Sequence, residues 1–175
     1  MAIREIITPP NPILRQPAQP VRELSSETQM LIDDMIETMR AAPGVGLAAP
    51  QVAVDQRIIV IEFAEDETED EDEPAAEPRL YVVINPEIVR HAQETVAGNE
   101  GCLSLPGYMG EVDRFSWVSV EGMNRHGLPF KIQAQDWLAR IFQHEIDHLN
   151  GVLYIDRANK VWRMNEVEAE QTSRV

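Results

Sequence analysis

A His-Glu-x-x-His motif spans His144 to His148 and gives the first indication of chemistry in this sequence. On a helix, residues four positions apart lie about 40° apart around the axis, so both histidines can hold one metal ion. Glu145 points about 100° further round the helix, which leaves it off the metal and free to take a proton from a water molecule that the metal activates. The motif therefore predicts metal-assisted hydrolysis.

A hydrolytic metal needs a third protein ligand, and the sequence offers several candidates. They are a carboxylate, His91, His126 and Cys102, which is the single cysteine of the chain. We favour Cys102, because the segment Glu100–Pro106 contains a glycine that permits close approach and because a thiolate adds softness and negative charge. Two other interpretations of Cys102 stay open: a buried cysteine with no ligand role, and a nucleophile activated by a histidine base.

The element that must position the motif is an amphipathic helix. Apolar residues recur at helical spacing before and after the histidines: Trp137, Leu138, Ile141, Phe142 and Leu149. Gly151 then supplies a C-terminal stop. Because the two histidines share the side that carries Trp137 and Ile141, we expect the metal to lie inside the protein against an apolar wall.

A second helix is expected near the N-terminus. Ser26 and Gln29 form a capping box there, and one apolar stripe follows, made of Leu31, Ile32, Met35, Ile36 and Met39. The next segment, Gly44–Gln51, is small and glycine-rich, which suits a backbone that approaches a ligand closely. Strands are predicted at Arg57–Phe63 and Leu80–Ile84.

The second half of the chain has the pattern of short strands and turns. Phe115–Glu121 alternates in polarity, Asn124–Gly127 predicts a turn, and Leu128–Gln133 returns as a hairpin that leads into the motif helix. A short strand at Val152–Ile155 and a charged C-terminal helix at Asn159–Glu170 complete the prediction. We therefore expect one α+β domain over residues 1–175, with mainly antiparallel sheets packed around the central metal-binding helix.

Composition and charge exclude several classes of function. A formal net charge of −15 argues against nucleic acid, DNA included, as a direct partner. Much of that charge lies in Glu65–Pro78, which contains no base and which we expect to be a solvated surface loop. No apolar run approaches the roughly 18 residues of a membrane span, and one cysteine is consistent with a reducing compartment. We expect a soluble, cytoplasmic protein.

Three stretches together resemble the peptide deformylases: Gly44–Gln51, Glu100–Ser104 and Gln143–His148. Their order and the intervals between them also resemble that family. The resemblance implies that Cys102, His144 and His148 are the metal ligands and that Glu145 is the general acid/base. It further implies that the Gln51 side chain and the Leu103 backbone N–H stabilise an oxyanion, and that Gly46 hydrogen-bonds the bound peptide.

The resemblance also implies the substrate, which is the N-formyl group on the initiating methionine of nascent polypeptides, released as formate. Water activated by the metal would attack the formyl carbon while Glu145 transfers the proton. Val45, Trp137 and Ile141 are expected walls of the methionine pocket, and Glu100 is expected to pair with Arg114. Fe²⁺ is the metal that the resemblance favours, with Zn²⁺, Ni²⁺ and Co²⁺ as alternatives.

Three other functions remain to be distinguished. They are a non-catalytic relative that binds formyl peptides, a cysteine hydrolase that uses Cys102, and a purely structural metal site. Three features depart from what the resemblance leads us to expect: the acidic stretch Glu65–Pro78, a tail with few bases, and Arg140, a polar residue near the expected apolar wall of the pocket. Some members are thought to dock on ribosomal RNA through a basic C-terminal helix, so a transient ribosome contact is an open question here.

Overall fold

The computed structural model of the chain describes residues 1–65 and 76–165. These residues form two α-helices, eight strands and three short 3₁₀ helices, which confirms the α+β class. In chain order they are η1 (Pro12–Arg15), α1 (Ser26–Ala41), β1 (Gly46–Ala48), η2 (Ala49–Val52), β2 (Ile58–Phe63), β3 (Arg79–His91), β4 (Thr95–Glu100), β5 (Tyr108–Phe115), β6 (Trp117–Met123), β7 (Pro129–Gln135), α2 (Asp136–Leu149), η3 (Tyr154–Asp156) and β8 (Lys160–Arg163).

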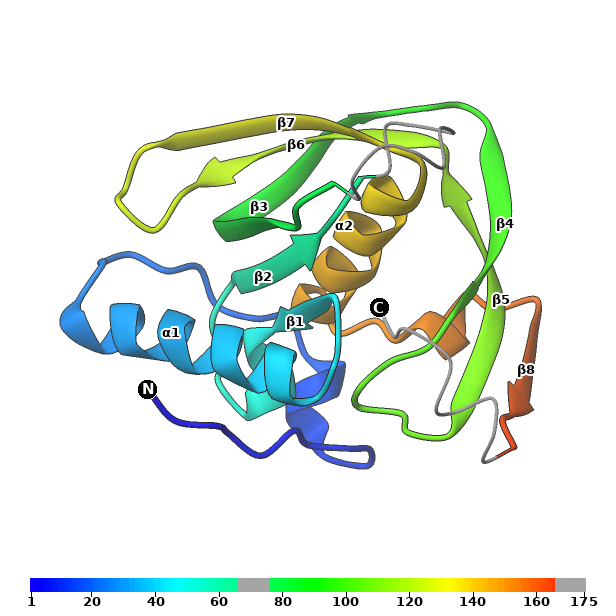
Figure 1. The fold of residues 1–175 in the computed structure, drawn as a ribbon, viewed down its shortest axis with the longest axis horizontal. Coiled ribbons are helices and arrows are strands. Elements are labelled where there is room, and N and C mark those ends of the chain that lie inside the picture. The colour runs from blue at the N-terminus through cyan, green and yellow to red at the C-terminus, as the bar shows by residue number, and fades with distance from the viewer. Residues whose placement is uncertain (66–75, 166–175) are drawn as a thin grey trace.

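The strands form two sheets, with helix α2 between them (Figure 1). One sheet has five strands in the order β1-β2-β3-β6-β7, and the other has three in the order β4-β5-β8. All neighbouring strands are antiparallel, as the sequence predicted. Helix α1 lies on the side of β1 and β2 (Figure 1). The motif helix therefore has a sheet on either side of it.

The predicted hairpin is confirmed, with small shifts in its bounds. Strands β6 and β7 pair from Trp117↔Gln135 to Met123↔Pro129, and Gly127 takes a positive φ of 78° in the turn between them. Phe115 belongs to β5 rather than to this hairpin. Strand β3 continues well past the predicted end at Ile84, through a register shift between Ile84 and Glu87. A bulge there accommodates Pro86, which has no N–H to donate to the sheet.

Helix α1 confirms the predicted apolar stripe but begins one residue earlier than the capping box suggested. The N-cap is Ser25, whose side chain accepts a hydrogen bond from the Thr28 backbone N–H at 3.2 Å. Ser26 is the first helical residue instead. The stripe is buried in a cluster with β1 and β2 that includes Leu31, Ile32, Met35, Ile36, Met39, Leu47 and Val60.

Helix α2 is buried along almost its whole length and ends where the sequence predicted. Gly151 has a φ of 75°, a backbone conformation that glycine adopts without strain and that terminates helices. The Arg57 side chain supports the same end, because it donates hydrogen bonds to the Leu149 carbonyl and the Asn150 side chain, both at 3.0 Å. The Leu149 carbonyl is one of the acceptors that a helix C-terminus leaves without an intrahelical partner, and it also accepts a hydrogen bond from the Ala18 N–H at 2.8 Å.

The predictions for the C-terminal segment are partly wrong. Val152–Ile155 is not a strand, since Tyr154–Asp156 forms a 3₁₀ helix. The first part of the predicted tail helix, Lys160–Arg163, is instead strand β8 paired with β5, because pairing with an available sheet edge outweighs weak helical periodicity. Residues 166–170 of that prediction, and most of the acidic stretch Glu65–Pro78, lie outside the described residues. No described helix has the length and hydropathy needed to cross a membrane.

Candidate metal centre

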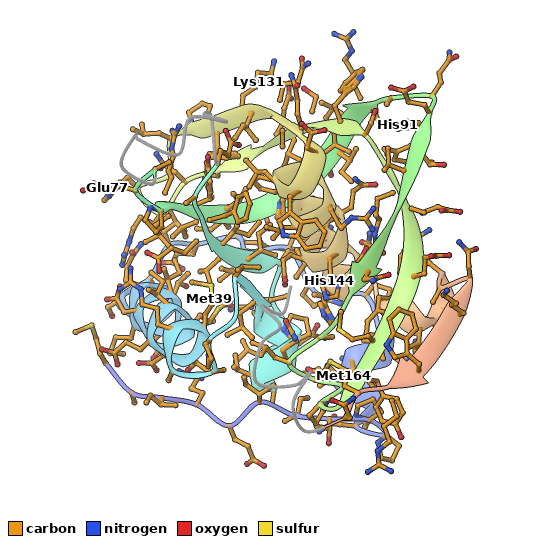
Figure 2. The ribbon with its side chains drawn as sticks, turned by 45° about the vertical axis from the view of Figure 1, so that its right-hand side comes forward. Met39, Glu77, His91, Lys131, His144 and Met164 are labelled. Carbon is orange, nitrogen blue, oxygen red and sulfur yellow. The ribbon has the colours of Figure 1, made fainter. Side chains whose placement is uncertain are left out.

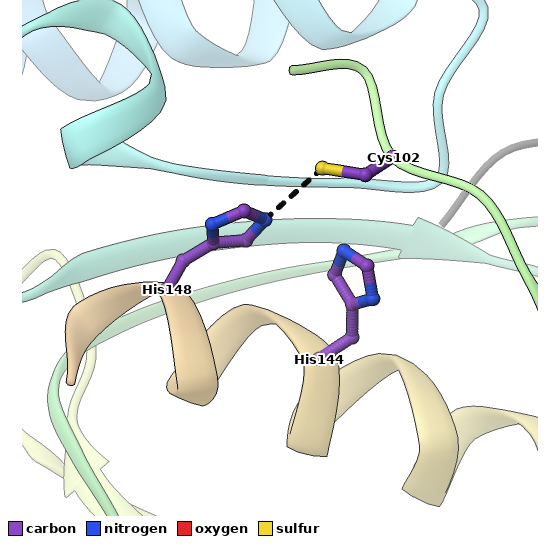
Figure 3. Close-up of side chains that lie close together, drawn as sticks. All are labelled: Cys102, His144 and His148. Atoms are coloured by element: carbon purple, nitrogen blue, oxygen red, sulfur yellow. Dashed lines mark hydrogen bonds between the residues drawn. The ribbon is translucent and has the colours of Figure 1, made fainter. Parts of the chain in front are cut away.

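Three buried side chains with metal-binding atoms meet beside α2. His144 and His148 project from successive turns of the helix, and Cys102 comes from the loop between β4 and β5 (Figure 3). Their ligand atoms all lie within 4.8 Å of one another, and the Cys102 Sγ is 3.3 Å from the His148 Nε2. One sulfur and two imidazole nitrogens at this spacing can hold a single divalent ion.

Glu100, the last residue of β4, orients His144. Its Oε1 lies 2.8 Å from the His144 Nδ1. Burial alone would raise the pKa of Glu100, but hydrogen bonds from Arg114 and His144 outweigh it and lower the pKa below its usual range. An ionised carboxylate can only accept, so the His144 Nδ1 is the donor, which directs the Nε2 away from Glu100 as the atom available to a metal ion. That Nε2 is buried with no hydrogen-bond partner among the described residues, as a metal ligand would be.

The environment of Cys102 also fits a metal ion. Burial raises the pKa of its thiol to about 12, whereas nucleophilic cysteines have a lowered pKa. A divalent cation reverses this preference, because it stabilises the thiolate directly. Burial likewise lowers the pKa of His148, which keeps the ring neutral, as ligation requires. This donor set therefore fits a bound cation better than a cysteine nucleophile.

Glu145 lies beside the three ligands without belonging to them. Its side chain is fully buried, and neither carboxylate oxygen has a hydrogen-bond partner among the described residues. Burial, and then the charge of Glu100, raise its pKa well above the ordinary value. The carboxylate packs against β1, where a Cβ on Gly46 would come within 2.4 Å of the Glu145 Oε1. Glycine at this position is what allows β1 to lie so close to Glu145.

Gln51 and Leu103 both lie next to Cys102. The Gln51 Oε1 accepts a hydrogen bond from the Ala48 N–H at 2.9 Å, which fixes the amide. Its Nε2 then points to the Ser104 hydroxyl at 3.2 Å and the Cys102 Sγ at 3.5 Å. Leu103 follows Cys102 directly and is buried in the cluster under α1. The structure thus brings together both predicted oxyanion donors and the predicted metal ligands.

The three predicted pocket walls are less closely grouped. Ile141 is fully buried in the core against the five-stranded sheet, and Val45 is half-buried beside the same core. Trp137 is 36% exposed and lines two cavities, of about 510 Å³ and about 330 Å³. The smaller cavity also includes Gly98 and Arg140. Of the three residues, Trp137 is the one that faces open space.

The expected pair of Glu100 and Arg114 is present, with two hydrogen bonds of 2.9 Å each. The sequence did not predict how far this ion pair extends. Arg140 donates to the Glu100 Oε2 at 2.8 Å, Arg114 donates to Asp147 at 2.6 Å, and Asp147 also pairs with Arg157. The sequence did contain one indication of these ion pairs. Arg140 and Asp147 lie one turn before and one turn after the first motif histidine on a helix expected to be buried, and buried charged residues are almost always paired.

The alternative histidine ligands lie elsewhere. The His91 ring stacks on Phe115 at 3.9 Å between centroids, and its Nδ1 lies 2.7 Å from the Ala92 carbonyl oxygen. Figure 2 shows His91 well away from His144. His126 is exposed in the β6–β7 turn. The structure thus removes both residues as candidates for the third ligand.

Comparison with known sequences gives a consistent answer. Residues 3–164 match the family described as Polypeptide deformylase. A peptide deformylase from Symbiobacterium thermophilum is 47% identical over 171 residues, which cover 98% of this chain and 74% of that protein. One from Halothermothrix orenii is 48% identical over 151 residues, covering 86% of this chain and 90% of that protein.

Solved structures agree. A class I type b peptide deformylase from Acinetobacter baumannii superposes with a TM-score of 0.80 at 36% identity, covering 90% of this chain and 99% of that one. The peptide deformylase from Thermotoga maritima gives a TM-score of 0.79 at 38% identity, covering 91% of this chain and all of that one. The fold described above is therefore that of these structures.

Proposed function

Because this chain belongs to the polypeptide deformylase family, we propose that it removes the N-formyl group from the initiating methionine of nascent polypeptides and releases formate. The reaction is the hydrolysis of an amide. The observation that carries the proposal is the convergence of Cys102, His144 and His148 beside Glu145 and Gln51, which all lie in buried surroundings. This is a set of residues suited to amide hydrolysis.

Cys102, His144 and His148 would hold the metal ion through Sγ and two imidazole nitrogens. When bound, a divalent ion there supplies Lewis-acid chemistry, because it acidifies a water molecule and draws charge from a carbonyl oxygen. Glu100 holds the His144 ring in the tautomer that ligation needs. Three protein ligands are the number that hydrolytic metal sites typically use, and an ion held by them would have room for water or substrate.

Glu145 moves the proton in this proposal. It accepts a proton from the attacking water and returns it to the leaving amine, for which its free, buried carboxylate is suited. The Gln51 Nε2 and the Leu103 N–H donate hydrogen bonds to the formyl oxygen as negative charge develops on it. The Gln51 amide is already fixed by the Ala48 N–H, so little reorganisation is needed.

The peptide would bind along β1, at the outer edge of the five-stranded sheet. An extended peptide can add to such an edge through main-chain hydrogen bonds, and Gly46, which packs against Glu145, would make one of them. Val45, Trp137 and Ile141 are proposed to shape the space for the methionine side chain, with Trp137 as the exposed wall and Ile141 packed behind it. A formyl carbon bears only hydrogen, so the enclosed site can exclude larger acyl groups.

Fe²⁺ is the metal that we propose for this site. Thiolate and imidazole ligands are compatible with zinc, iron, cobalt and nickel, so the donor set alone does not select one. We expect aerobically prepared protein to be weakly active, because iron and thiolate oxidise in air. Loading with Fe²⁺, Ni²⁺ or Co²⁺ under reducing conditions should give a faster enzyme than loading with Zn²⁺. A zinc form that is equally fast and air-stable would refute iron as the working metal.

The test of the function is formate release from two matched peptides that differ only in carrying an N-formyl or an N-acetyl methionine. Anaerobically prepared, Ni²⁺-loaded protein should release formate from the first and no acetate from the second. A chelator should abolish the activity, and metal should restore it. Activity that survives the chelator and stops on thiol alkylation would indicate a cysteine hydrolase. No release of formate by fully loaded protein would refute the proposal.

A further inference from the structure

Arg140 lies one helical turn before His144 and is buried, with 5% of its surface exposed. Its two terminal nitrogens donate to acceptors on β4 and β5. NH1 donates to the Glu100 Oε2 and to the Val112 carbonyl, both at 2.8 Å, and NH2 donates to the Val96 carbonyl at 2.7 Å. One side chain of α2 thus holds a carboxylate and a backbone carbonyl of β4, together with a carbonyl of β5.

Glu100 is the point at which these contacts reach the metal centre. Its Oε2 accepts from the Arg114 Nε and from Arg140, and its Oε1 accepts from the Arg114 NH2 and the His144 Nδ1. The bidentate pair with Arg114 alone would neutralise this carboxylate. Charge balance therefore does not require the second arginine. What Arg140 adds is a direct connection from the helix that carries His144 to the strand that carries Glu100.

Gly98 provides the space for this arrangement. A Cβ at residue 98 would lie 2.7 Å from the Arg140 Cζ and NH2 atoms and 2.9 Å from its Nε. These distances are too short for real contacts, so a side chain there would displace the guanidinium. No positive φ is recorded for Gly98, so its backbone does not require glycine. The reason for glycine at this position is the close approach of Arg140.

We propose that Arg140 is a positioning residue of the metal centre, which fastens Glu100 and β4 to α2 and thereby fixes the orientation of the His144 ring. The proposal rests on the proposed function only in assigning His144 to the metal. Arg140 also lies over the Trp137 ring, 5.7 Å from its centroid, so the test must separate metal binding from an effect on the proposed methionine pocket. Partners that hydrogen-bond a ligating histidine typically change metal affinity by about 10- to 100-fold when they are removed, and Arg140 acts one step further out, through such a partner.

The test measures metal binding directly, with Co²⁺ as the probe. Apo protein is titrated with Co²⁺ in competition with a chromophoric chelator, and the visible absorption of the Co²⁺ form reports the ligand geometry. Arg140→Met should bind Co²⁺ about 10-fold more weakly and shift the absorption bands. Arg140→Lys should restore little, because an ammonium group cannot span the same acceptors. In a formyl-peptide assay kcat should fall, whereas a role confined to the cavity that Trp137 lines would change KM and leave Co²⁺ binding as in the parent.

Gly98→Ala tests the contacts of Arg140 independently, by displacing its guanidinium. It should weaken Co²⁺ binding in the same direction but by less, since the guanidinium is displaced rather than lost. In the double variant with Arg140→Met, the alanine should have no further effect, because the group that it displaces is absent. If the two changes instead add fully, Gly98 and Arg140 act separately and the proposal fails. This variant also serves if Arg140→Met does not fold.

Arg157→Met is the matched control. Arg157 pairs with Asp147 in the same charged cluster, and its recorded hydrogen bonds reach neither Glu100 nor β4. Its loss should change Co²⁺ affinity by less than about 3-fold, well below the range for direct partners of a ligating histidine. Equal losses in the two variants, or wild-type affinity and spectrum in folded Arg140→Met, would overturn the proposal. Wild-type protein that binds Co²⁺ normally but releases no formate would refute the proposed function and leave this inference standing.

Discussion

The two sheets hold helix α2 by different kinds of interaction. Toward the five-stranded sheet, the helix presents apolar side chains, among them Phe142 and Ile146, which pack in one buried cluster with strand residues such as Val83 and Val120. Toward the three-stranded sheet, the same helix presents Arg140, whose partners are a carboxylate and backbone carbonyls. The metal ligands lie on this second side, where Cys102 approaches from the β4–β5 loop.

Because of this difference, we expect the free energy of folding and the geometry of the metal centre to depend on different residues of α2. Apolar packing depends mainly on buried area and volume, and the attraction itself has little directional preference. Hydrogen bonds between charged groups are directional, and they fix the rotation of the rings and carboxylates that they join. We therefore expect changes on the apolar side to act on folding, and changes on the charged side to act on metal binding and turnover.

Phe142→Ala is the strongest test on the apolar side. Phe142 is fully buried and packs against Tyr81 and Phe130, with ring centroids 5.8 Å and 6.4 Å away. The cavity and the lost burial should reduce the free energy of unfolding by about 3–5 kcal/mol, measured by urea denaturation. Turnover per folded molecule should stay within a few-fold. Phe142→Leu, which keeps most of the volume, is the control and should cost less than about 1.5 kcal/mol.

Glu145→Gln is the corresponding test among the residues of the metal centre. The amide keeps the shape of the side chain but cannot accept and return a proton. Turnover should fall by at least ~100-fold, which corresponds to about 2.7 kcal/mol in activation free energy. Metal content by elemental analysis and the urea midpoint should stay near those of the parent. A variant that loses its metal together with its fold would show that Glu145 is a ligand or a structural residue.

Arg57→Met sharpens the comparison, because it removes a charge that belongs to neither interface. Arg57 donates to the Leu149 carbonyl and the Asn150 side chain at the end of α2, and the variant loses these hydrogen bonds, although the Leu149 carbonyl keeps the one from the Ala18 N–H. The free energy of unfolding should fall by about 1–2 kcal/mol, while Co²⁺ affinity stays unchanged. A weakened metal site in this variant would mean that the end of the helix, as well as its charged side, determines the position of the ligands.

Arg40→Met should have the smallest effect, because its ion pair with Glu62 lies near the surface. Exposed pairs contribute less than about 1 kcal/mol. The hydrogen bond from Arg40 lowers the pKa of Glu62, so this contribution is present above the ordinary pKa of 4.5 and is lost as the pH falls through the lowered value. The difference in unfolding free energy between parent and variant should therefore shrink from pH 7 toward about pH 3. A difference that grows in acid would contradict this assignment.

Much of the site could be predicted because its pattern is local. The spacing of His144 and His148 fixes both on one face of any helix, and the apolar stripe around them identifies that helix from a few turns of sequence. The same holds for α1, where only the N-cap moved by one residue, from Ser26 to Ser25. Boundaries of this kind depend on side-chain hydrogen bonds that compete between adjacent serines.

Other features depend on segments that are distant in the sequence. Lys160–Arg163 has no strong strand pattern and becomes β8 because the edge of β5 is available to it. The partners of Arg140 come from β4 and β5, so no local periodicity could identify them.

By itself, then, the sequence determined the α+β class, the histidine pair on its helix and the family. The tertiary structure alone decided which charges meet Glu100, how Gly98 makes room for Arg140, and how near Cys102 comes to both rings. The physical reason is the sequence separation of the residues that interact. Helical periodicity and capping depend on residues a few positions apart. The contacts of Glu100, Arg140 and Cys102 join residues that are distant in the sequence, so they form only when the two sheets pack around α2.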